Sequence, residues 1–96
     1  MKMLNIIYTD YFEDLITKEL RQAGFKKYTK VQGTTGVGEV SGAKLGTSYA
    51  PGKNNILYML VSEDEVPTLF AIVQKLRRDH PKGGFRALTY TVDEFI

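Results

Sequence analysis

The sequence predicts an α+β sandwich in which four strands form one antiparallel sheet and two helices cover one face of it. Three observations predict this fold class: two apolar segments suited to buried strands, two segments with helical periodicity, and the order strand, helix, strand, strand, helix, strand. This order is most simply a ferredoxin-like βαββαβ arrangement. In that topology the first and third strands are central, and the second and fourth lie at the edges.

The first half of the chain contains a strand, a helix and a second strand. Residues 3–8, MLNIIY, form a short apolar run that predicts a buried strand. A helix is expected next, because Asp10 and Glu13 have the spacing of a capping box and apolar residues recur at helical spacing up to Gly24, where a helix commonly stops. The alternation over residues 28–32 then predicts a strand with one face in water.

The second half repeats the pattern. Residues 55–61, NILYMLV, are apolar on both faces, as expected of a central strand. Ser62 or Asp64 caps a second helix, and Pro67 favours the later start, because proline is tolerated only where its missing amide has no helical partner. Residues 85–92 then form the last strand.

The third strand carries apolar side chains on a face that the helices do not cover. Ile56, Tyr58 and Leu60 alternate with the residues that face the helices. A large exposed apolar surface is typical of an interaction site. We therefore expect the sheet to pack against other copies of itself.

One connection is unusually long for a single domain of 96 residues. Residues 33–52, GTTGVGEVSGAKLGTSYAPG, hold six of the nine glycines and almost nothing that could enter a core. Such a connection is usually functional or disordered. We interpret residues 34–54 as a long flexible loop without regular structure, which closes in a type II turn at residues 51 and 52.

The composition excludes several classes of function. The net charge of +2, from 13 basic and 11 acidic residues, is too balanced for a protein that binds nucleic acid or an anionic membrane. Without cysteine there is no disulfide, thiolate metal site or cysteine nucleophile. No segment resembles a signal peptide or a membrane span. We expect a cytoplasmic protein without nucleic-acid partners or membrane insertion.

Catalytic and metal-binding constellations are scarce. His80 is the single histidine, and a solvated helix end is the simplest interpretation of its surroundings. The adjacent carboxylates Glu63, Asp64 and Glu65 complement a helix dipole. No group of residues has the spacing of a metal site. We therefore expect no catalytic residue and no metal ligand.

Two glycine-containing turns nevertheless carry basic residues. Residues 36–44 complete neither a dinucleotide fingerprint nor a P-loop, but flexible amides beside Lys44 and Lys53 suit an anion, with a merely solvated loop as the alternative. The second turn, residues 82–84, precedes Arg86, which can hold a phosphate in bidentate fashion. Its alternative is a tight turn with an exposed arginine.

These features together resemble the PII signalling superfamily. The resemblance rests on the order of elements over nearly the whole chain, on the long loop between the second and third strands, and on the glycine turn before the last strand. The local matches are AGF (23–25), KYTKVQG (27–33) and GFRALTYTVDEFI (84–96).

The resemblance implies a homotrimer that binds a small effector, usually ATP, ADP or AMP, in the clefts between its subunits. The long loop, called the T-loop in the family, would change shape with the ligand and dock on a transporter or enzyme. Thr29 matches a threonine of the adenine pocket, and Gly33 matches the glycine at which the T-loop begins. The nucleotide site implied in this way comprises Thr29, Gly33, Gly36, Gly38, Lys82, Gly83, Gly84 and Arg86, with Lys44 and Lys53 as loop contacts to phosphate.

The chain also departs from the classical pattern. Residues 34–38 lack the Arg-Gln pair that classical members use for phosphate and for the magnesium–2-oxoglutarate site, and no basic C-terminal extension follows. Arg86 stands where classical members usually carry a lysine. Tyr49 lies in the loop that can carry a uridylylated tyrosine, but its flanks do not match. We expect a divergent PII-like protein that does not sense 2-oxoglutarate.

Two other classes of function stay open. A trimeric CutA-like structural or metal-handling accessory protein would share the fold without binding nucleotide, although one histidine and no cysteine argue against metal. A small enzyme such as the ferredoxin-like acylphosphatases would use a basic turn with Asn54 and Asn55, but the motifs of that family are not recognisable. The effector is also open between an adenylate, a cyclic dinucleotide and bicarbonate.

Overall fold

Four strands form one antiparallel sheet, with β1 and β5 in its centre and β2 and β6 at its edges. The computed structural model describes residues 1–38, 42–44 and 53–96 of the chain. The central strands are the two apolar segments and the edge strands are the more polar ones, as predicted. The strands are β1 (Lys2–Thr9), β2 (Thr29–Thr34), β5 (Asn54–Val61) and β6 (Arg86–Thr91).

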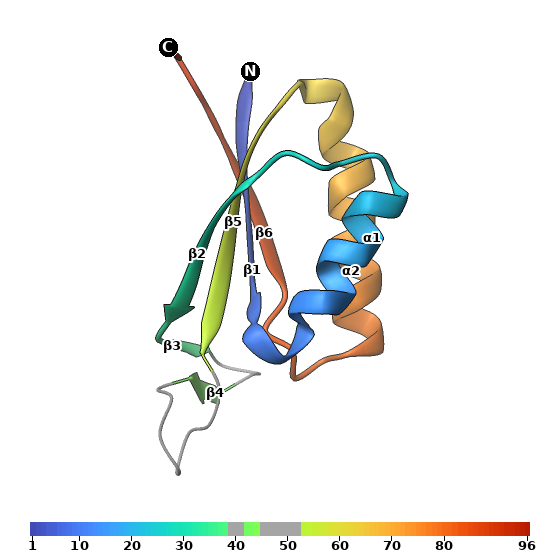
Figure 1. Ribbon diagram of the computed structural model, residues 1–96, viewed down its shortest axis with the longest axis vertical. Coiled ribbons are helices and arrows are strands. Elements are labelled where there is room, and N and C mark those ends of the chain that lie inside the picture. The colour runs from blue at the N-terminus through green and yellow to red at the C-terminus, as the bar shows by residue number, and fades with distance from the viewer. Residues whose placement is uncertain (39–41, 45–52) are drawn as a thin grey trace.

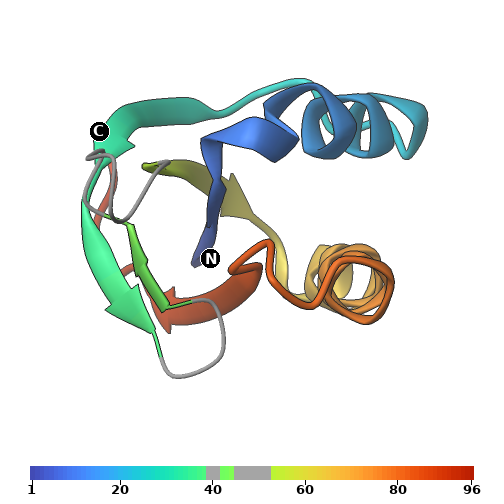
Figure 2. The same cartoon turned by 90° about the horizontal axis from the view of Figure 1, so that it is seen from below.

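Two helices lie against the same face of this sheet (Figures 1 and 2). A short 3-10 turn, η1 (Asp10–Phe12), leads into α1 (Glu13–Gln22), and a second one, η2 (Glu63–Glu65), leads into α2 (Val66–Asp79). The ferredoxin-like α+β fold predicted from the sequence is therefore confirmed. No helix in the described part of the chain is long and apolar enough to cross a membrane.

The core lies between the sheet and the helices. Successive strand residues point to opposite faces, and the buried apolar residues of β1 and β5 alternate along each strand on the face toward the helices. Each fully buried aliphatic side chain contributes about 1.5–3 kcal/mol. The buried apolar residues are Leu4, Ile6, Tyr8, Ile16, Leu20, Leu57, Met59, Val61, Leu69, Val73, Leu76 and Phe85.

The first helix begins differently from the prediction, and the second helical segment is capped at one of its two predicted positions. Glu13 does not complete a capping box with Asp10, because its carboxylate instead accepts hydrogen bonds from Tyr8 of β1 and Asn55 of β5. The second helical segment is capped at Ser62 rather than at Asp64: the Ser62 amide donates to Glu65 Oε1 at 2.9 Å. An intervening 3-10 turn lets this early cap coexist with the later proline.

The connection between β2 and β5 contains regular structure that the sequence did not predict. Residues Gly36–Gly38 form β3 and residues Gly42–Lys44 form β4, and the two strands pair antiparallel. The expectation of a loop without secondary structure over residues 34–54 is wrong for these segments. The turn at residues 51 and 52 lies outside the described residues, as does Tyr49.

No helix in the described part of the chain covers the face of the sheet opposite α1 and α2 (Figures 1 and 2). The register places Tyr58 of β5 beside Asn5 of β1 and Thr29 of β2, and Leu88 of β6 on the other side of Asn5. Ile56, Tyr58 and Leu60 lie on this face, as expected. We call it the open face; its apolar residues are Met3, Ile7, Val31, Ile56, Tyr58, Leu60, Leu88 and Tyr90.

Candidate functional site

The end of β1 joins the two glycine-containing connections. The amide of Thr9 donates to the carbonyl oxygen of Gly83 at 2.8 Å, and the next amide, that of Asp10, donates to the carbonyl oxygen of Lys53 at 2.8 Å. Two consecutive backbone groups thus fix the turn before β6 and the return into β5. The chain brings both connections to one end of the sheet, where β3 and β4 also lie (Figure 1).

The turn before β6 has little room for side chains. Gly83 is buried, and a Cβ atom there would lie 2.7 Å from the ring of Phe85 and 3.1 Å from that of Phe12. His80 ends α2, and its ring packs on Phe12 with 4.9 Å between ring centroids. Arg86 is exposed just beyond the turn and donates a hydrogen bond to the Phe85 carbonyl oxygen at 2.9 Å.

The other connection leaves β2 through a second glycine. Gly33 has φ +70°, in the left-handed region that favours glycine, and its amide donates to Asn55 Oδ1 at 3.2 Å. Thr34 Oγ1 donates to the Asn54 carbonyl oxygen at 2.8 Å. Gly36 lies close by, since a Cβ atom there would be 3.3 Å from Asn54 Nδ2.

Three buried side-chain oxygen atoms in the described residues lack a hydrogen-bond partner. The register of β1 and β5 places all three residues on the open face of the sheet. The three atoms are Asn5 Oδ1, Thr9 Oγ1 and Asn54 Oδ1. Thr9 and Asn54 are direct partners across β1 and β5. Buried polar atoms are nearly always paired, so these three oxygen atoms are free to accept a hydrogen bond from outside the chain.

The structure brings most of the predicted site residues to this end of the sheet. Gly33, Gly36 and Lys53 lie on one side of the Thr9–Asp10 link, and Gly83, Gly84 and Arg86 on the other, with Lys82 exposed in the turn. Gly38 pairs with Gly42 in the β3–β4 sheet, and Lys44 pairs with Gly36 there. Thr29 is not brought to this end; it lies on the open face beside Tyr58.

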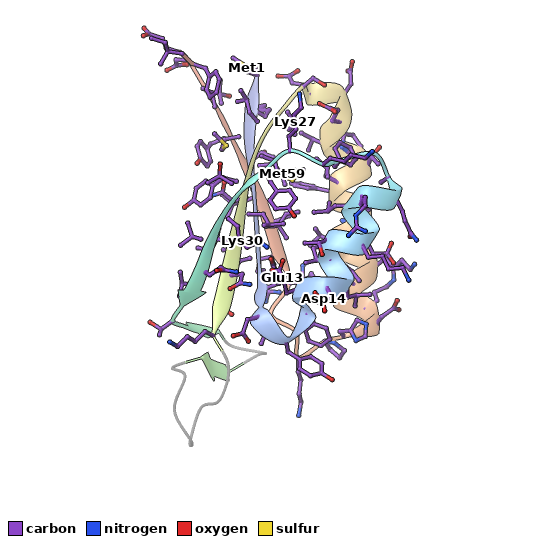
Figure 3. The ribbon with its side chains drawn as sticks, in the orientation of Figure 1. Met1, Glu13, Asp14, Lys27, Lys30 and Met59 are labelled. Atoms are coloured by element: carbon purple, nitrogen blue, oxygen red, sulfur yellow. The ribbon has the colours of Figure 1, made fainter. Side chains whose placement is uncertain are left out.

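A polar cluster on the helix side of the sheet was not predicted. Glu13 accepts hydrogen bonds at Oε1 from the Tyr8 hydroxyl and from Asn55 Nδ2, the latter at 2.9 Å, and its Oε2 pairs with the Lys30 ammonium. Glu13 projects from the start of α1 and Lys30 from β2, and both are labelled in Figure 3. One carboxylate thus connects α1 with three strands.

The environment of this cluster shifts the pKa values of its members. Burial, reinforced by the hydrogen bond to Glu13, raises the pKa of Tyr8. Burial alone would raise the pKa of Glu13, but the hydrogen bonds from Lys30, Tyr8 and Asn55 outweigh it and lower that pKa. The bond to Glu13 raises the pKa of Lys30 against a smaller opposing effect of burial. The network therefore holds a carboxylate, an ammonium and a neutral phenol at neutral pH.

A cleft of about 770 Å³ opens beside the cluster, and its lining residues are Thr9, Asp10, Tyr11, Glu13, Gln32, Gly33 and Asn55. The described residues contain no group of three or more His, Asp or Glu side chains that could hold a metal ion.

The one sequence signal for the polar cluster around Glu13 was Asn55, a polar residue in the row of β5 that faces the helices. Its partners Tyr8, Glu13 and Lys30 are far apart in sequence, so local spacing did not reveal them.

The chain matches one protein family and several solved structures. The model of the family described as nitrogen regulatory protein P-II matches residues 1–92. CPII from Thiomonas intermedia K12, a nitrogen regulatory PII-like protein bound to ADP, AMP and bicarbonate, has a TM-score of 0.75 and 23% identity over 93% of this chain and 82% of that chain. Its apo form has a TM-score of 0.63 and 26% identity over 95% and 89% of the two chains.

A PII-like signaling protein from Thermus thermophilus has a TM-score of 0.58 and 26% identity, over 95% of this chain and 84% of that chain. None of the curated proteins searched matches the chain. The fold of these solved structures is the fold described above.

Proposed function

The chain belongs to the nitrogen regulatory protein P-II family, and from that membership we propose that it is a homotrimeric signalling protein that binds an adenine nucleotide between its subunits. It regulates a transporter or enzyme through the segment between β2 and β5, and it is not itself an enzyme. CPII, which shares the fold, is bound to ADP and AMP. That ligand chemistry is the one we assign to this chain.

The open face supports assembly of the chain with copies of itself. Val31, Leu88 and Tyr90 are between 40% and 46% exposed in the single chain, and they border the apolar centre of this face. Exposed apolar area of this extent is stabilised by burial against a partner. The family supplies the identity of the partner, a second and third copy, with the three open faces turned inward.

The single observation that carries the effector site is the unpaired pair Thr9 Oγ1 and Asn54 Oδ1. These atoms lie at the end of the sheet that the Gly83 turn and Gly36 also approach. Hydroxyl and amide oxygens in such a position suit the hydroxyl groups or the amino group of a nucleotide. The Arg86 guanidinium, with donors to spare beyond its one backbone bond, is the phosphate ligand.

The route from effector to target follows the chain. Gly33 and Gly36 start the connection that leaves β2, so an effector seated between them and the Gly83 turn contacts that connection directly. A ligand shifts a conformational equilibrium only through contacts that differ between the two states. Such contacts, made at Gly33 and Gly36 and at amides further along the connection, would select the conformation that the target protein recognises. Thr29 would reach the base from the open face of an adjacent copy.

The test is isothermal titration of the purified protein with ADP, AMP, ATP and bicarbonate, with Arg86→Glu as the site variant. We expect at least one adenylate to bind, and Arg86→Glu to weaken it by about tenfold to a hundredfold, the value of a charge-assisted hydrogen bond. Arg78→Glu is the matched control, because Arg78 is exposed on α2 and lines a different hollow. The proposal is contradicted if no adenylate binds. It is also contradicted if Arg86→Glu binds the adenylate as tightly as Arg78→Glu does.

A further inference from the structure

The hydrogen-bond ladder between β2 and β5 breaks at the point where the chain leaves β2. Val31 pairs with Ile56 and Thr34 pairs with Asn54, so β2 has one residue more than β5 between these pairs. The extra residue makes a β-bulge, a feature that redirects a strand. Gly33 lies in the bulge, and its amide donates to the side chain of Asn55.

Asn55 is held in a single orientation. Its Nδ2 donates to Glu13 Oε1 at 2.9 Å, and its Oδ1 accepts from the Gly33 amide. An ionised carboxylate can only accept, so the amide nitrogen of Asn55 has to face Glu13 and its oxygen has to face Gly33. Asn55 is only 3% exposed, which leaves water little access to replace either partner.

Glu13 is anchored in turn. The buried Tyr8 hydroxyl donates to Oε1, and Lys30 pairs with Oε2. Lys30 precedes Gly33 by three residues on β2, so Glu13 holds β2 twice, directly at Lys30 and through Asn55 at Gly33. Both attachments come from α1 and β5, which belong to the core of the fold.

We infer that Asn55 and Glu13 are positioning residues that fix the direction in which the chain leaves β2 at Gly33. Through the bulge, the core sets the path of the following segment before any effector binds. The consequence for signalling rests on the proposed function, which gives that segment the contacts with effector and target. The positioning itself does not depend on a ligand.

The test is amide hydrogen exchange of the full chain without ligand, followed by NMR at Gly33. Asn55→Ala removes the acceptor of the Gly33 amide, and we expect exchange at that amide to accelerate about tenfold, the effect of losing one ordinary hydrogen bond. Tyr8→Phe is the matched control, since it removes another donor to the same Glu13 oxygen and leaves both bonds of Asn55 in place. In Tyr8→Phe we expect the exchange rate of the Gly33 amide to change only as far as the loss of global stability requires.

A second variant keeps the test decisive if Asn55→Ala does not fold. Glu13→Gln preserves side-chain size but offers an amide in place of the second carboxylate oxygen, so Asn55 is no longer confined to one orientation. We expect faster exchange at Gly33 than in Tyr8→Phe. Unchanged exchange at Gly33 in the folded Asn55 and Glu13 variants, or equal acceleration in Tyr8→Phe, overturns the inference.

Titration with ADP separates this inference from the proposed function. If ADP binds the native protein and Gly33 exchange does not respond to Asn55→Ala, the effector site stands and the positioning role fails. If Gly33 exchange responds as expected and no adenylate binds, the positioning role stands and the proposed function fails. If both hold, Asn55→Ala should weaken ADP more than Tyr8→Phe does.

Discussion

Glu13 and Lys30 form an ion pair that joins the first turn of α1 to the edge strand β2. Both side chains are about three-quarters buried, with 24% and 23% of their surface exposed. The Tyr8 hydroxyl and Asn55 Nδ2 donate to the same carboxylate. The pair therefore belongs to a network in which every donor depends on one acceptor.

Removal of that acceptor should be costly. Glu13→Ala leaves the hydroxyl of Tyr8, the amide of Asn55 and the ammonium of Lys30 without their partner, and we expect the free energy of unfolding to fall by about 2–4 kcal/mol. Urea unfolding measures this loss. Asp14→Ala is the control, because Asp14 is the exposed neighbour in the same turn, and equal losses in the two variants would refute the account of the network.

The same network predicts a loss of stability in acid. The pKa of Glu13 is lowered in the folded chain, so the unfolded chain takes up its proton first as the pH falls. The contribution of Glu13 is complete above the unfolded pKa of about 4.3 and disappears as the pH falls through the lower folded value. Unfolding free energies measured between pH 6 and pH 3 should decline more steeply in the native protein than in Glu13→Gln. Parallel profiles would show that Glu13 carries no such linkage.

Gly83 offers a test of the turn that carries the candidate site. An added methyl group meets the buried ring of Phe85, so the turn or the ring has to move. We expect Gly83→Ala to cost about 1–3 kcal/mol, the usual cost of overpacking. Gly24→Ala is the comparison, because nothing lies within 4 Å of that position and only its φ of +92° opposes the substitution. Thermal unfolding that is unaffected by Gly83→Ala would contradict the described packing.

The fold was readable from the sequence, because its signals are local. Apolar runs marked β1 and β5, helical periodicity marked α1 and α2, and alternation marked the edge strands. At the second helix the capping box of Ser62 with Glu65 decided between the two predicted caps. At the first helix the strand partners of Glu13 outweighed its capping-box spacing with Asp10. The pairing of β3 with β4 was missed because glycine-rich segments have little β propensity.

The site was readable only in part. Glycine and arginine at Gly33, Gly83 and Arg86 indicated turns suited to an anion, and chain topology brought those turns together. The Glu13 network could not be predicted, because it depends on the register between β2 and β5 and on the position of α1. Asn55 in an otherwise apolar inward row was its one local sign.

The open face gives a prediction on assembly. Tyr58 lies at its centre, flanked by Asn5 and Thr29. Tyr58→Glu places a charge where we propose that copies meet, and burial of an unpaired charge is strongly unfavourable. We expect light scattering to report a trimer for the native protein and smaller species for the variant. Tyr11→Glu, at a tyrosine that is 84% exposed on η1, should remain trimeric, and a trimeric Tyr58→Glu would refute the proposed interface.

We propose that copies of this chain assemble and hold an adenine nucleotide between them. Native mass spectrometry without ligand and with ADP, AMP or ATP is the decisive measurement, because the mass reports the number of chains and of bound nucleotides together. We expect a species of three chains that takes up as many as three nucleotides, with weaker uptake in Arg86→Glu and assembly retained. A single chain as the only species, or a trimer that takes up no ADP, AMP or ATP, would contradict it.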